Sequence, residues 1–331
     1  MTFAGRKVLV TGAGGFIGSH LAEALVEAGA AVRAFVIYDS LGSAGWLDHS
    51  KRRDDMDIIA GDLADRDSVH AAMRNCDVVF HLGALIAIPY SYRAPASYVR
   101  VNVEGTLNVL QSARELGVGR VVHTSTSEVY GTARYVPINE AHPLQAQSPY
   151  AASKIAADKL AESFHLSFGL PVVTVRPFNT FGPRQSPRAV IPTVALQCLK
   201  GEEIRLGNLS PTRDFTFVDD TVRGFLHAAQ GQSAIGETFN LGTGREVSIA
   251  DLVRLLGEVT AMEPRIVQSS ERVRPANSEV ERLCADAGRA ERDLGWKPQV
   301  TLEEGLRRFV AWLGENMQLH LSRYSPSDYA I

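Results

Sequence analysis

Cysteine is scarce in this sequence: there are three among 331 residues, Cys76, Cys198 and Cys284, and they lie far apart. There is no Cys-x-x-Cys pair and no Cys/His spacing of the kind that binds zinc. An odd number of distant cysteines therefore predicts neither a disulfide framework nor a metal site.

Long hydrophobic runs and a strong excess of one charge are also missing. The sequence has no stretch of about 18 apolar residues, the length needed to span a bilayer. The N-terminus enters a strand-like pattern without the features of a signal peptide. The net charge of −3 disfavours binding to nucleic acid or to an anionic membrane. These absences predict a cytoplasmic protein that binds neither.

What the sequence does contain is a regular alternation of apolar and amphipathic segments over its first 180 residues. Near-continuous runs of β-branched and apolar residues are typical of strands buried on both faces of a parallel sheet. The segments between them have the pattern of helices. The expected strands are 6–11, 31–38, 56–61, 77–84, 120–126 and 171–178, and the expected helices are 16–27, 65–73, 103–116 and 150–168.

Strand–helix alternation at this rhythm predicts an α/β fold with a doubly wound parallel sheet of the Rossmann type. We expect residues 1–180 to form this domain. Residues 181–331, whose loops carry more Pro, Gly and Arg, are expected to form a smaller C-terminal α/β domain, with part of 214–245 returning to the first. Ser248 and Thr301 each precede an acid by three residues, which predicts helix N-caps.

A glycine-rich turn follows the first expected strand, in "VLVTGAGGFIGSHLAEAL". Gly12, Gly15 and Gly18 permit close approach of a ligand to the backbone, and the helix that opens with Phe16 and Ile17 offers free N–H groups at its N-terminus. Pyrophosphate needs both features. A plain strand–helix turn is the alternative, but a strand before the glycines and a helix after them favour a dinucleotide site.

The acid that would hold the ribose of such a cofactor lies further along the sequence than expected. An NAD site favours an acid at the end of the second strand; in "AFVIYDS" that acid is Asp39, with Val36 nearer the expected position. No Arg or Lys stands in this turn to meet a 2′-phosphate, so we expect NAD, without excluding NADP. Asp62, in "GDL" after the third strand, is a candidate for the adenine edge or, equally, a helix N-cap.

A Tyr and a Lys lie four positions apart in "SPYAASK", at the start of a long expected helix. Tyr150 and Lys154 therefore share one helix face. A lysine ammonium beside a phenol stabilises the phenolate and lowers the tyrosine pKa, so that Tyr150 could act as a base. Thr126, at the end of the fifth expected strand in "STSEVYG", could bind the same substrate oxygen. The alternative is that Tyr150 and Lys154 are solvent-exposed residues of an amphipathic helix without a catalytic role, and the glycine turn makes this less favoured.

With these motifs the chain resembles the extended short-chain dehydrogenase/reductases that modify nucleotide-activated sugars. The resemblance spans nearly the whole length and includes "TGAGGFIGSHL", "DVVFHLGA", "VNVEGTLNVL", "TSTSEVYG", "SPYAASK", "RPFNTFGPRQ", "RDFTFVDD", "FNLGTG" and "LGWKP". It implies a tightly bound nicotinamide cofactor, oxidation of the sugar at C4 and return of the hydride within each cycle. It also implies that Thr126, Tyr150 and Lys154 are the catalytic residues.

The same resemblance implies further cofactor contacts. Leu63, Leu82 and Ala84 are expected beside the cofactor, together with Tyr150 and Lys154. Asn102 in "VNVEGT" is expected to order the helix on the cofactor side, with a helix cap as the alternative. His81 and His123 are interpreted as core or crevice histidines rather than ligands.

Glu128 distinguishes between the reactions of this family. C4 epimerases that resemble this chain usually have a small or aliphatic residue there, whereas a carboxylate suits the second proton transfer of a 4,6-dehydratase. Ser127 cannot be a general acid at neutral pH, and the Thr-Ser-Glu pattern resembles the GDP-mannose 4,6-dehydratases. "AFVIYDSLGSAGWLDH", "RPFNTFGPRQSPRAVIPT" and "RPANSEVERL" resemble the N-acetylglucosamine-nucleotide 4,6-dehydratases of legionaminic acid pathways.

Several alternatives stay open at this point. Glu128 could be a structural acid paired with an arginine. The Thr-Ser-Glu pattern also resembles UDP-glucuronate decarboxylases, although these need a cation for the substrate carboxylate that the sequence does not reveal. A C4 epimerase and a non-catalytic dinucleotide sensor are further readings of the same fold.

The substrate side is predicted mainly by resemblance. A diphosphate favours guanidinium partners, and the resemblance assigns this role to Arg213 and Arg274. Further expected substrate contacts are Ser127, Asn179, Arg184 and, through its backbone, Val190.

The resemblance also implies a homodimer, formed by the helix that bears Tyr150 and the helix before it.

Overall fold

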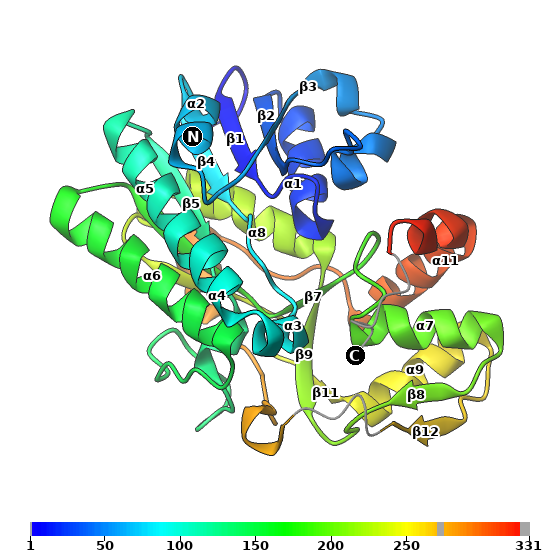
Figure 1. The fold of residues 1–331 in the computed structure, drawn as a ribbon. Helices are drawn as coiled ribbons and strands as arrows, with labels where there is room; N and C mark the ends of the chain where they lie inside the picture. The colour runs from blue at the N-terminus through cyan, green and yellow to red at the C-terminus, as the bar shows by residue number, and fades with distance from the viewer. Residues whose placement is uncertain (1, 270–274, 325–331) are drawn as a thin grey trace.

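The computed structural model describes residues 2–269 and 275–324, and its centre is a seven-stranded parallel sheet (Figure 1). The strand order is β10-β6-β5-β4-β1-β2-β3, so the chain starts in the middle of the sheet and winds outward in both directions. This confirms the doubly wound α/β fold. The strands are β1 (Lys7–Thr11), β2 (Ala31–Ile37), β3 (Met56–Gly61), β4 (Val78–His81), β5 (Arg120–Thr124), β6 (Val172–Pro177) and β10 (Thr238–Leu241).

Helices cover both faces of this sheet (Figure 1). On one face α2, α5 and α6 lie side by side, and on the other α1 packs against α8. The sheet strands are almost wholly buried because both faces are covered, which is why their sequences are continuous apolar runs. The bounds are α1 (Phe16–Glu27), α2 (Arg66–Met73), α3 (Ile88–Arg93), α4 (Pro95–Tyr98), α5 (Gly105–Glu115), α6 (Pro149–Phe168) and α8 (Val218–Gln230).

Two strands end two or more residues earlier than predicted, and both ends matter for the site. β4 stops at His81 rather than 84, because the chain turns where the Gly83 N–H donates to the Thr11 hydroxyl at 3.1 Å. β5 stops at Thr124 rather than 126. The chain then enters a short 3₁₀ turn (η4, Ser127–Tyr130). Residues expected within strands therefore lie in loops at the carboxyl edge of the sheet.

The helix expected at 103–116 is part of a longer helical run. It begins with α4, widens into a π-helical turn (η3, Val99–Glu104) and continues as α5. A π turn adds a residue to the helical repeat. Asn102 lies in this widened turn and is buried.

After β6 the chain builds a smaller layer beyond the carboxyl edge of the sheet (Figure 1). Its helices begin where predicted: Ser248 caps α9 through the Asp251 N–H, and Thr301 caps α11 through the Glu304 N–H. Both N-cap predictions are confirmed. The remaining elements are β7 (Asn179–Phe181), α7 (Val190–Lys200), β8 (Ile204–Leu206), β9 (Thr212–Phe217), β11 (Glu246–Ser248), α9 (Ile249–Thr260), β12 (Ile266–Gln268), α10 (Gly288–Leu294) and α11 (Leu302–Ser322).

The chain returns to the large sheet within this second half. β10 pairs in parallel with β6, and α8 packs on β5 and β6. One hydrophobic cluster runs from Val8 and Val10 of β1 to Leu252 of α9 and Leu306 of α11. The smaller layer is thus joined to the sheet by shared core packing, so the site between them is held by both.

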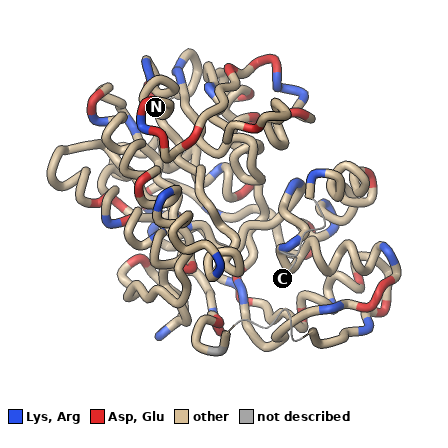
Figure 2. The backbone as a smooth tube through the Cα atoms, in the orientation of Figure 1, with Lys and Arg blue, Asp and Glu red and all other residues tan. Residues whose placement is uncertain are grey.

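Charged residues of both signs are spread over the described chain rather than gathered in one region (Figure 2). None of the described helices is long and apolar enough to cross a membrane. Within the described residues there is also no group of three or more His, Cys, Asp or Glu side chains placed to hold a metal ion.

Candidate active site

The glycine turn between β1 and α1 is shaped for close backbone contacts. Gly12 has a positive φ of 69°, and a Cβ there would lie 2.8 Å from Gly83. A Cβ on Gly18 would lie 2.2 Å from the Gly12 carbonyl oxygen. Only glycine fits either position without displacing the backbone. The turn therefore brings α1 and the loop after β4 tightly against the end of β1.

The N-terminus of α1 is open to an anion. Its N-cap, Gly15, provides no side chain to bond the first N–H groups, and no acidic residue lies in the first turn. The orphan N–H groups of Phe16 and Ile17 and the positive end of the helix dipole therefore face the glycine turn. These features fit a cofactor pyrophosphate, as predicted.

Asp39 and Asp62 follow the carboxyl ends of β2 and β3. Asp39 lies two residues beyond β2, and its carboxylate accepts a hydrogen bond from the Leu41 N–H at 2.9 Å. Asp62 accepts from the Ala64 N–H at 2.9 Å, whereas the N-cap of α2 is Asp65. The N-cap alternative for Asp62 is therefore wrong. Both carboxylates stand at the sheet edge on the side of the glycine turn.

The loop after β4 is fixed by Asn102. Its amide oxygen accepts from the Leu85 N–H at 2.8 Å, and its amide nitrogen donates to the Leu85 carbonyl and to the Ser153 hydroxyl. Asn102 is therefore not a helix cap; it ties the loop that carries Leu82 and Ala84 to α6. Leu63, in the loop after β3, lies against Gly83 and Gly105.

Thr126, Tyr150 and Lys154 come together at the carboxyl end of β5. Thr126 is the N-cap of η4, and its hydroxyl is hydrogen-bonded to the Tyr150 phenol. Tyr150 is the second residue of α6, two positions after the N-cap Ser148, whose hydroxyl accepts from the Ala151 N–H. The Tyr150 side chain is 7% exposed and packs edge-to-face on Tyr98, with ring centroids 6.2 Å apart. Packing and capping together orient the phenol.

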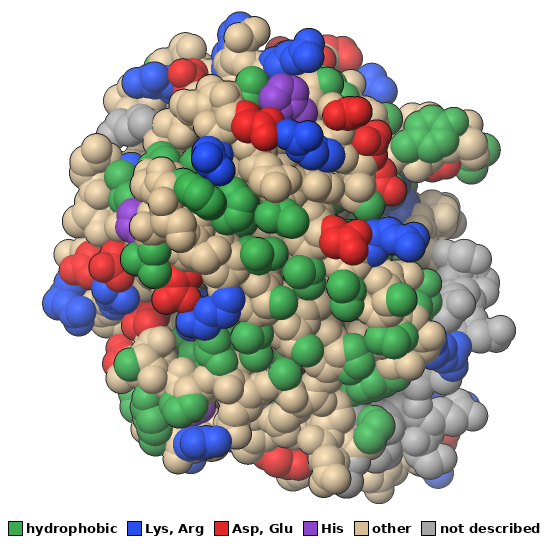
Figure 3. Space-filling view, turned by 60° about the vertical axis from the view of Figure 1, so that its left-hand side comes forward, with side chains coloured by type: hydrophobic (Ala, Val, Ile, Leu, Met, Phe, Trp, Pro, Cys, Tyr) green, Lys and Arg blue, Asp and Glu red, His purple; other side chains and the backbone are tan. Residues whose placement is uncertain are grey.

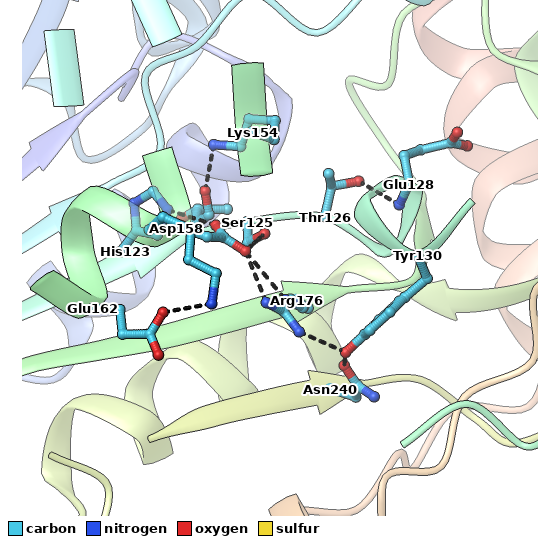
Figure 4. Close-up of polar contacts among 12 residues, drawn as sticks. His123, Ser125, Thr126, Glu128, Tyr130, Lys154, Asp158, Glu162, Arg176 and Asn240 are labelled. Carbon is cyan, nitrogen blue, oxygen red and sulfur yellow. Dashed lines mark hydrogen bonds and ion pairs between the residues drawn. The ribbon is translucent and has the colours of Figure 1, made fainter. Parts of the chain in front are cut away.

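One electrostatic expectation is wrong in this structure. Burial raises the pKa of Tyr150 well above its usual range, the bond to Thr126 opposes this, and the nearby Glu128 charge adds to it. Lys154 does not donate to the phenol: its ammonium donates to the Thr124 carbonyl at 2.6 Å (Figure 4). Burial lowers the pKa of Lys154 to about 8, while Asp158 acts in the opposite direction.

Glu128 lies on the same 3₁₀ turn, and its carboxylate is half-buried. Its backbone N–H donates to the Thr126 hydroxyl at 3.2 Å, and its side chain points away from this bond (Figure 4). Over residues 2–269 and 275–324 no arginine or lysine pairs with it. The structural ion pair considered for Glu128 is therefore absent from the described part of the chain.

A buried polar network lies behind Lys154 (Figure 4). Asp158 accepts from His123 at 3.0 Å, from Ser125 at 2.8 Å and from Arg176 at 3.0 Å. Although burial alone would raise it, bonding to His123 and the charges of Arg176 and Lys154 bring the pKa of Asp158 to about 2. His123 and His81 bond within the core, as predicted.

On the substrate side, Asn179 opens β7 directly after β6. Its amide oxygen is buried and has no hydrogen-bond partner among the described residues. This fits an acceptor for a hydrogen-bond donor on the substrate. Arg213 of β9 is buried and pairs with Glu279 at 3.3 Å. Arg184 pairs with Glu23 at 2.9 Å.

The remaining substrate predictions are placed as follows. Val190 is the first residue of α7, whose N-cap provides no side-chain bond, so N–H groups are open there. Ser127 is buried on η4 beside Glu128. Arg274 lies outside the described residues.

Sequence reasoning missed Asp158 and Arg176. The one available signal was the spacing of "KIAAD", which puts Asp158 four residues after Lys154 on the same helix face. Nothing in the sequence connects Arg176 of β6 with that position. Tyr98, which packs on Tyr150, was also missed.

The parallel sheet, the glycine turn and the Thr126–Tyr150–Lys154 trio together define an extended short-chain dehydrogenase/reductase. A family model described as GDP-mannose 4,6 dehydratase matches residues 9–309. The chain belongs to this family of nucleotide-sugar dehydratases and epimerases, which confirms the resemblance drawn from the sequence.

Relatives with both activities are similar to the chain to a comparable degree. A dTDP-glucose 4,6-dehydratase of Streptomyces antibioticus is 34% identical over 315 residues, covering 94% of this chain and 93% of the relative. A UDP-glucose 4-epimerase of Mycolicibacterium smegmatis is 36% identical over 320 residues, covering 94% and 100%. Family membership alone therefore does not choose between the two reactions.

A solved structure gives the cofactor context. The dTDP-glucose 4,6-dehydratase of Streptomyces venezuelae, with NAD and TYD bound, superposes with a TM-score of 0.86 at 32% identity, over 95% of this chain and 98% of that one. The prediction of NAD agrees with this relative and with the open N-terminus of α1 described above.

Proposed function

We propose that the protein is an NAD-dependent nucleotide-sugar 4,6-dehydratase that gives a 4-keto-6-deoxy sugar nucleotide, with an N-acetylglucosamine nucleotide as the expected substrate. One observation carries the proposal. The Glu128 carboxylate lies beside the Thr126–Tyr150–Lys154 trio, and no cation in the described part of the chain neutralises it. A C4 epimerase has no use for a second base at this place.

Each residue has a defined task. Thr126 holds the C4 oxygen and Tyr150 takes the C4 hydroxyl proton. Because burial raises the pKa of Tyr150, the phenolate that forms depends on the nearby charge of Lys154. Bound NAD would accept the C4 hydride and return it to C6. Glu128 removes the C5 proton, made acidic by the C4 ketone, and gives it to the C6 hydroxyl, which leaves as water. After the hydride adds at C6, C5 takes up a proton from solvent, and Tyr150 releases to solvent the proton that it took from the C4 hydroxyl, so protons balance over the cycle.

A single carboxylate must serve twice in this scheme. The neighbouring Ser127 is buried and cannot be a general acid at neutral pH. Glu128 is therefore base at C5 and then acid at the C6 oxygen. This sequential use is reasonable because one group that has just taken a proton is the correct acid for the next step.

Cofactor and substrate are assigned to opposite sides of the trio. For NAD we propose the glycine turn, Asp39 at the ribose and Asp62 at the adenine, with Asn102 acting through the β4 loop. For the substrate we propose the unpartnered Asn179 amide and the buried Arg213 guanidinium as the main polar contacts. Further proposed contacts are Ser127, Arg184, the Val190 backbone and Arg274.

The test is the mass of the product. Purified protein without added cofactor is incubated in turn with UDP- and GDP-N-acetylglucosamine, dTDP-glucose and GDP-mannose. We expect one of them to lose the mass of water, which also identifies the nucleotide and the sugar. If every sugar nucleotide keeps its mass, the dehydratase assignment is wrong.

A C4 epimerase is the second candidate, favoured by the 36% identical UDP-glucose 4-epimerase. Its product has the substrate's mass and an inverted C4 centre. The same incubation followed by sugar analysis therefore separates the two candidates.

We also propose that the protein forms a homodimer through α5 and α6. Hydrophobic side chains gather on the face that these helices cover (Figure 3). Val99 and Leu166 are exposed there, at 51% and 75%, and Ala152 and Ala156 present a small-residue surface on α6. Such a face is suited to packing against a second copy.

The dimer proposal predicts that Ala156→Arg gives monomers in sedimentation or light-scattering measurements. The added guanidinium would lie unpaired in an apolar contact, which is costly. Ala311→Arg, on the exposed side of α11, is the matched control and should leave the mass unchanged. A monomeric wild-type protein would overturn the proposal.

A further inference from the structure

Lys154 is buried, and burial makes its charged form less stable than it would be in water. Lys154 is almost fully buried, at 4% exposure, and its ammonium group donates to the neutral carbonyl of Thr124. Burial disfavours the charged form of lysine, and it lowers the pKa of Lys154 to about 8. No carboxylate forms an ion pair with Lys154 across residues 2–269 and 275–324, so its charge needs support from a group slightly further away.

Asp158 is that group. It lies one helical turn after Lys154 on the same face of α6 and is 5% exposed. Hydrogen bonds from His123, Ser125 and Arg176 hold its two oxygens in place. With its pKa near 2, Asp158 is an anion at every pH at which the protein would work.

Arg176 competes with Lys154 for this anion. It donates to Asp158 at 3.0 Å and to the Tyr130 hydroxyl at 2.9 Å, and Tyr130 in turn donates to Asn240 (Figure 4). Arg176 is therefore locked in place, and the field of Asp158 is shared between two cations.

The other charged or titratable groups around the pair do not replace Asp158. Burial lowers the pKa of both His81 and His123, so both rings are neutral at pH 7. Burial raises the pKa of Tyr150, so a phenolate there depends on a nearby cation and cannot itself replace Asp158 as the anion that supports Lys154. A cavity of about 350 Å³ also reaches Asp158, and the titratable groups that line it are Glu140, His142, Lys159, Glu162, His165 and Arg176.

We propose that Asp158 is a positioning residue that keeps Lys154 in its charged form, and that Arg176, Ser125 and His123 serve to hold the Asp158 carboxylate in place. The role of the charged Lys154 in stabilising a Tyr150 phenolate rests on the proposed function. The electrostatic link between Asp158 and Lys154 does not.

The link can be measured without any substrate. The chain has six lysines, so NMR of protein labelled with ¹³C at the lysine Cε gives a simple spectrum, in which Lys154→Met identifies the Lys154 signal. We expect a titration midpoint of about 8 in the wild type. In Asp158→Asn, which keeps the size of the side chain, the midpoint should fall by roughly one pH unit. An unchanged midpoint in a folded variant would overturn the proposal.

Two further variants separate the charge effect from damage to the fold. Asp214 is another fully buried carboxylate, bonded to Thr243, Gly244 and Ala285, so Asp214→Asn should lower stability and leave the Lys154 midpoint unchanged. Arg176→Gln removes the competing cation and should move the midpoint to higher pH. If Asp158→Asn does not fold, Arg176→Gln still tests the proposal. A Lys154 midpoint that falls or stays unchanged in that variant would overturn it.

Turnover gives a second readout with a defined sign. A group needed in its protonated form loses activity as the pH rises through its pKa. The high-pH limb of the rate profile should therefore move to lower pH in Asp158→Asn. A shifted midpoint in a protein that removes no water would sink the proposed function alone, and loss of water with an unshifted midpoint would sink the inference alone.

Discussion

Replacing Glu128 by glutamine should slow the loss of water about 10³-fold while leaving oxidation at C4 in place. Thr126, Tyr150 and Lys154 carry out the first step, and none of them is hydrogen-bonded to the Glu128 carboxylate. Glutamine has the same shape but cannot take the C5 proton. The variant should therefore accumulate reduced nicotinamide, seen by its near-ultraviolet absorbance, without releasing a deoxy product.

The matched control is Glu237→Gln. Glu237 is also half-buried, but it pairs with Arg289 and directly precedes β10, at the amino end of the parallel strands and so opposite to the carboxyl edge where Glu128 lies. We expect full turnover in this variant. If Glu128→Gln removed water at the wild-type rate, Glu128 would be a structural acid, and the epimerase candidate would become the better one.

The parts of the fold that follow local rules were predictable from the sequence. The strands are continuous apolar runs because both faces are covered, and the caps at Ser248 and Thr301 are satisfied by N–H groups three residues away. The ends of β4 and β5 were predicted too late, because the apolar Leu82 and Ala84 and the β-branched Thr126 extend the strand-like pattern beyond them. Their turns depend on distant partners, such as the bond from Gly83 to Thr11.

The residues of the site that depend on local sequence were predicted, and those that depend on the folded chain were missed. The glycine turn and the Tyr150–Lys154 spacing are local and were found, as was Glu128. Asp158 and Arg176 were not, because α6 and β6 meet only in the folded chain.

The hydrogen-bond partner of Lys154 could not be predicted from the sequence either. Helical spacing puts its Cβ on the face of Tyr150, but the ammonium at the end of a flexible side chain reaches the Thr124 carbonyl on β5. Periodicity predicts which residues share a face; it does not predict which distant atom completes a hydrogen bond.

Gly18→Ala should remove about 3 kcal/mol from the free energy of unfolding, the upper end of the cost of overpacking, and the purified variant should lack bound nicotinamide nucleotide. The added Cβ would stand 2.2 Å from the Gly12 carbonyl oxygen and 3.1 Å from the Ala13 Cα, which are backbone atoms with little room to move. Helix α1 must then shift away from β1, and its N–H groups leave the place where a pyrophosphate would bind.

Denaturant unfolding and the nucleotide content of the purified protein measure the two effects separately. Gly314→Ala is the matched control: Gly314 is an exposed residue of α11, and a Cβ there meets no atom within 4 Å. That substitution should raise the free energy of unfolding by about 0.5–1 kcal/mol, because alanine restricts the unfolded chain and favours the helix. Full nucleotide content in Gly18→Ala would mean that α1 can shift without loss of the cofactor, so the close contact between Gly18 and Gly12 would be a packing feature rather than part of the site.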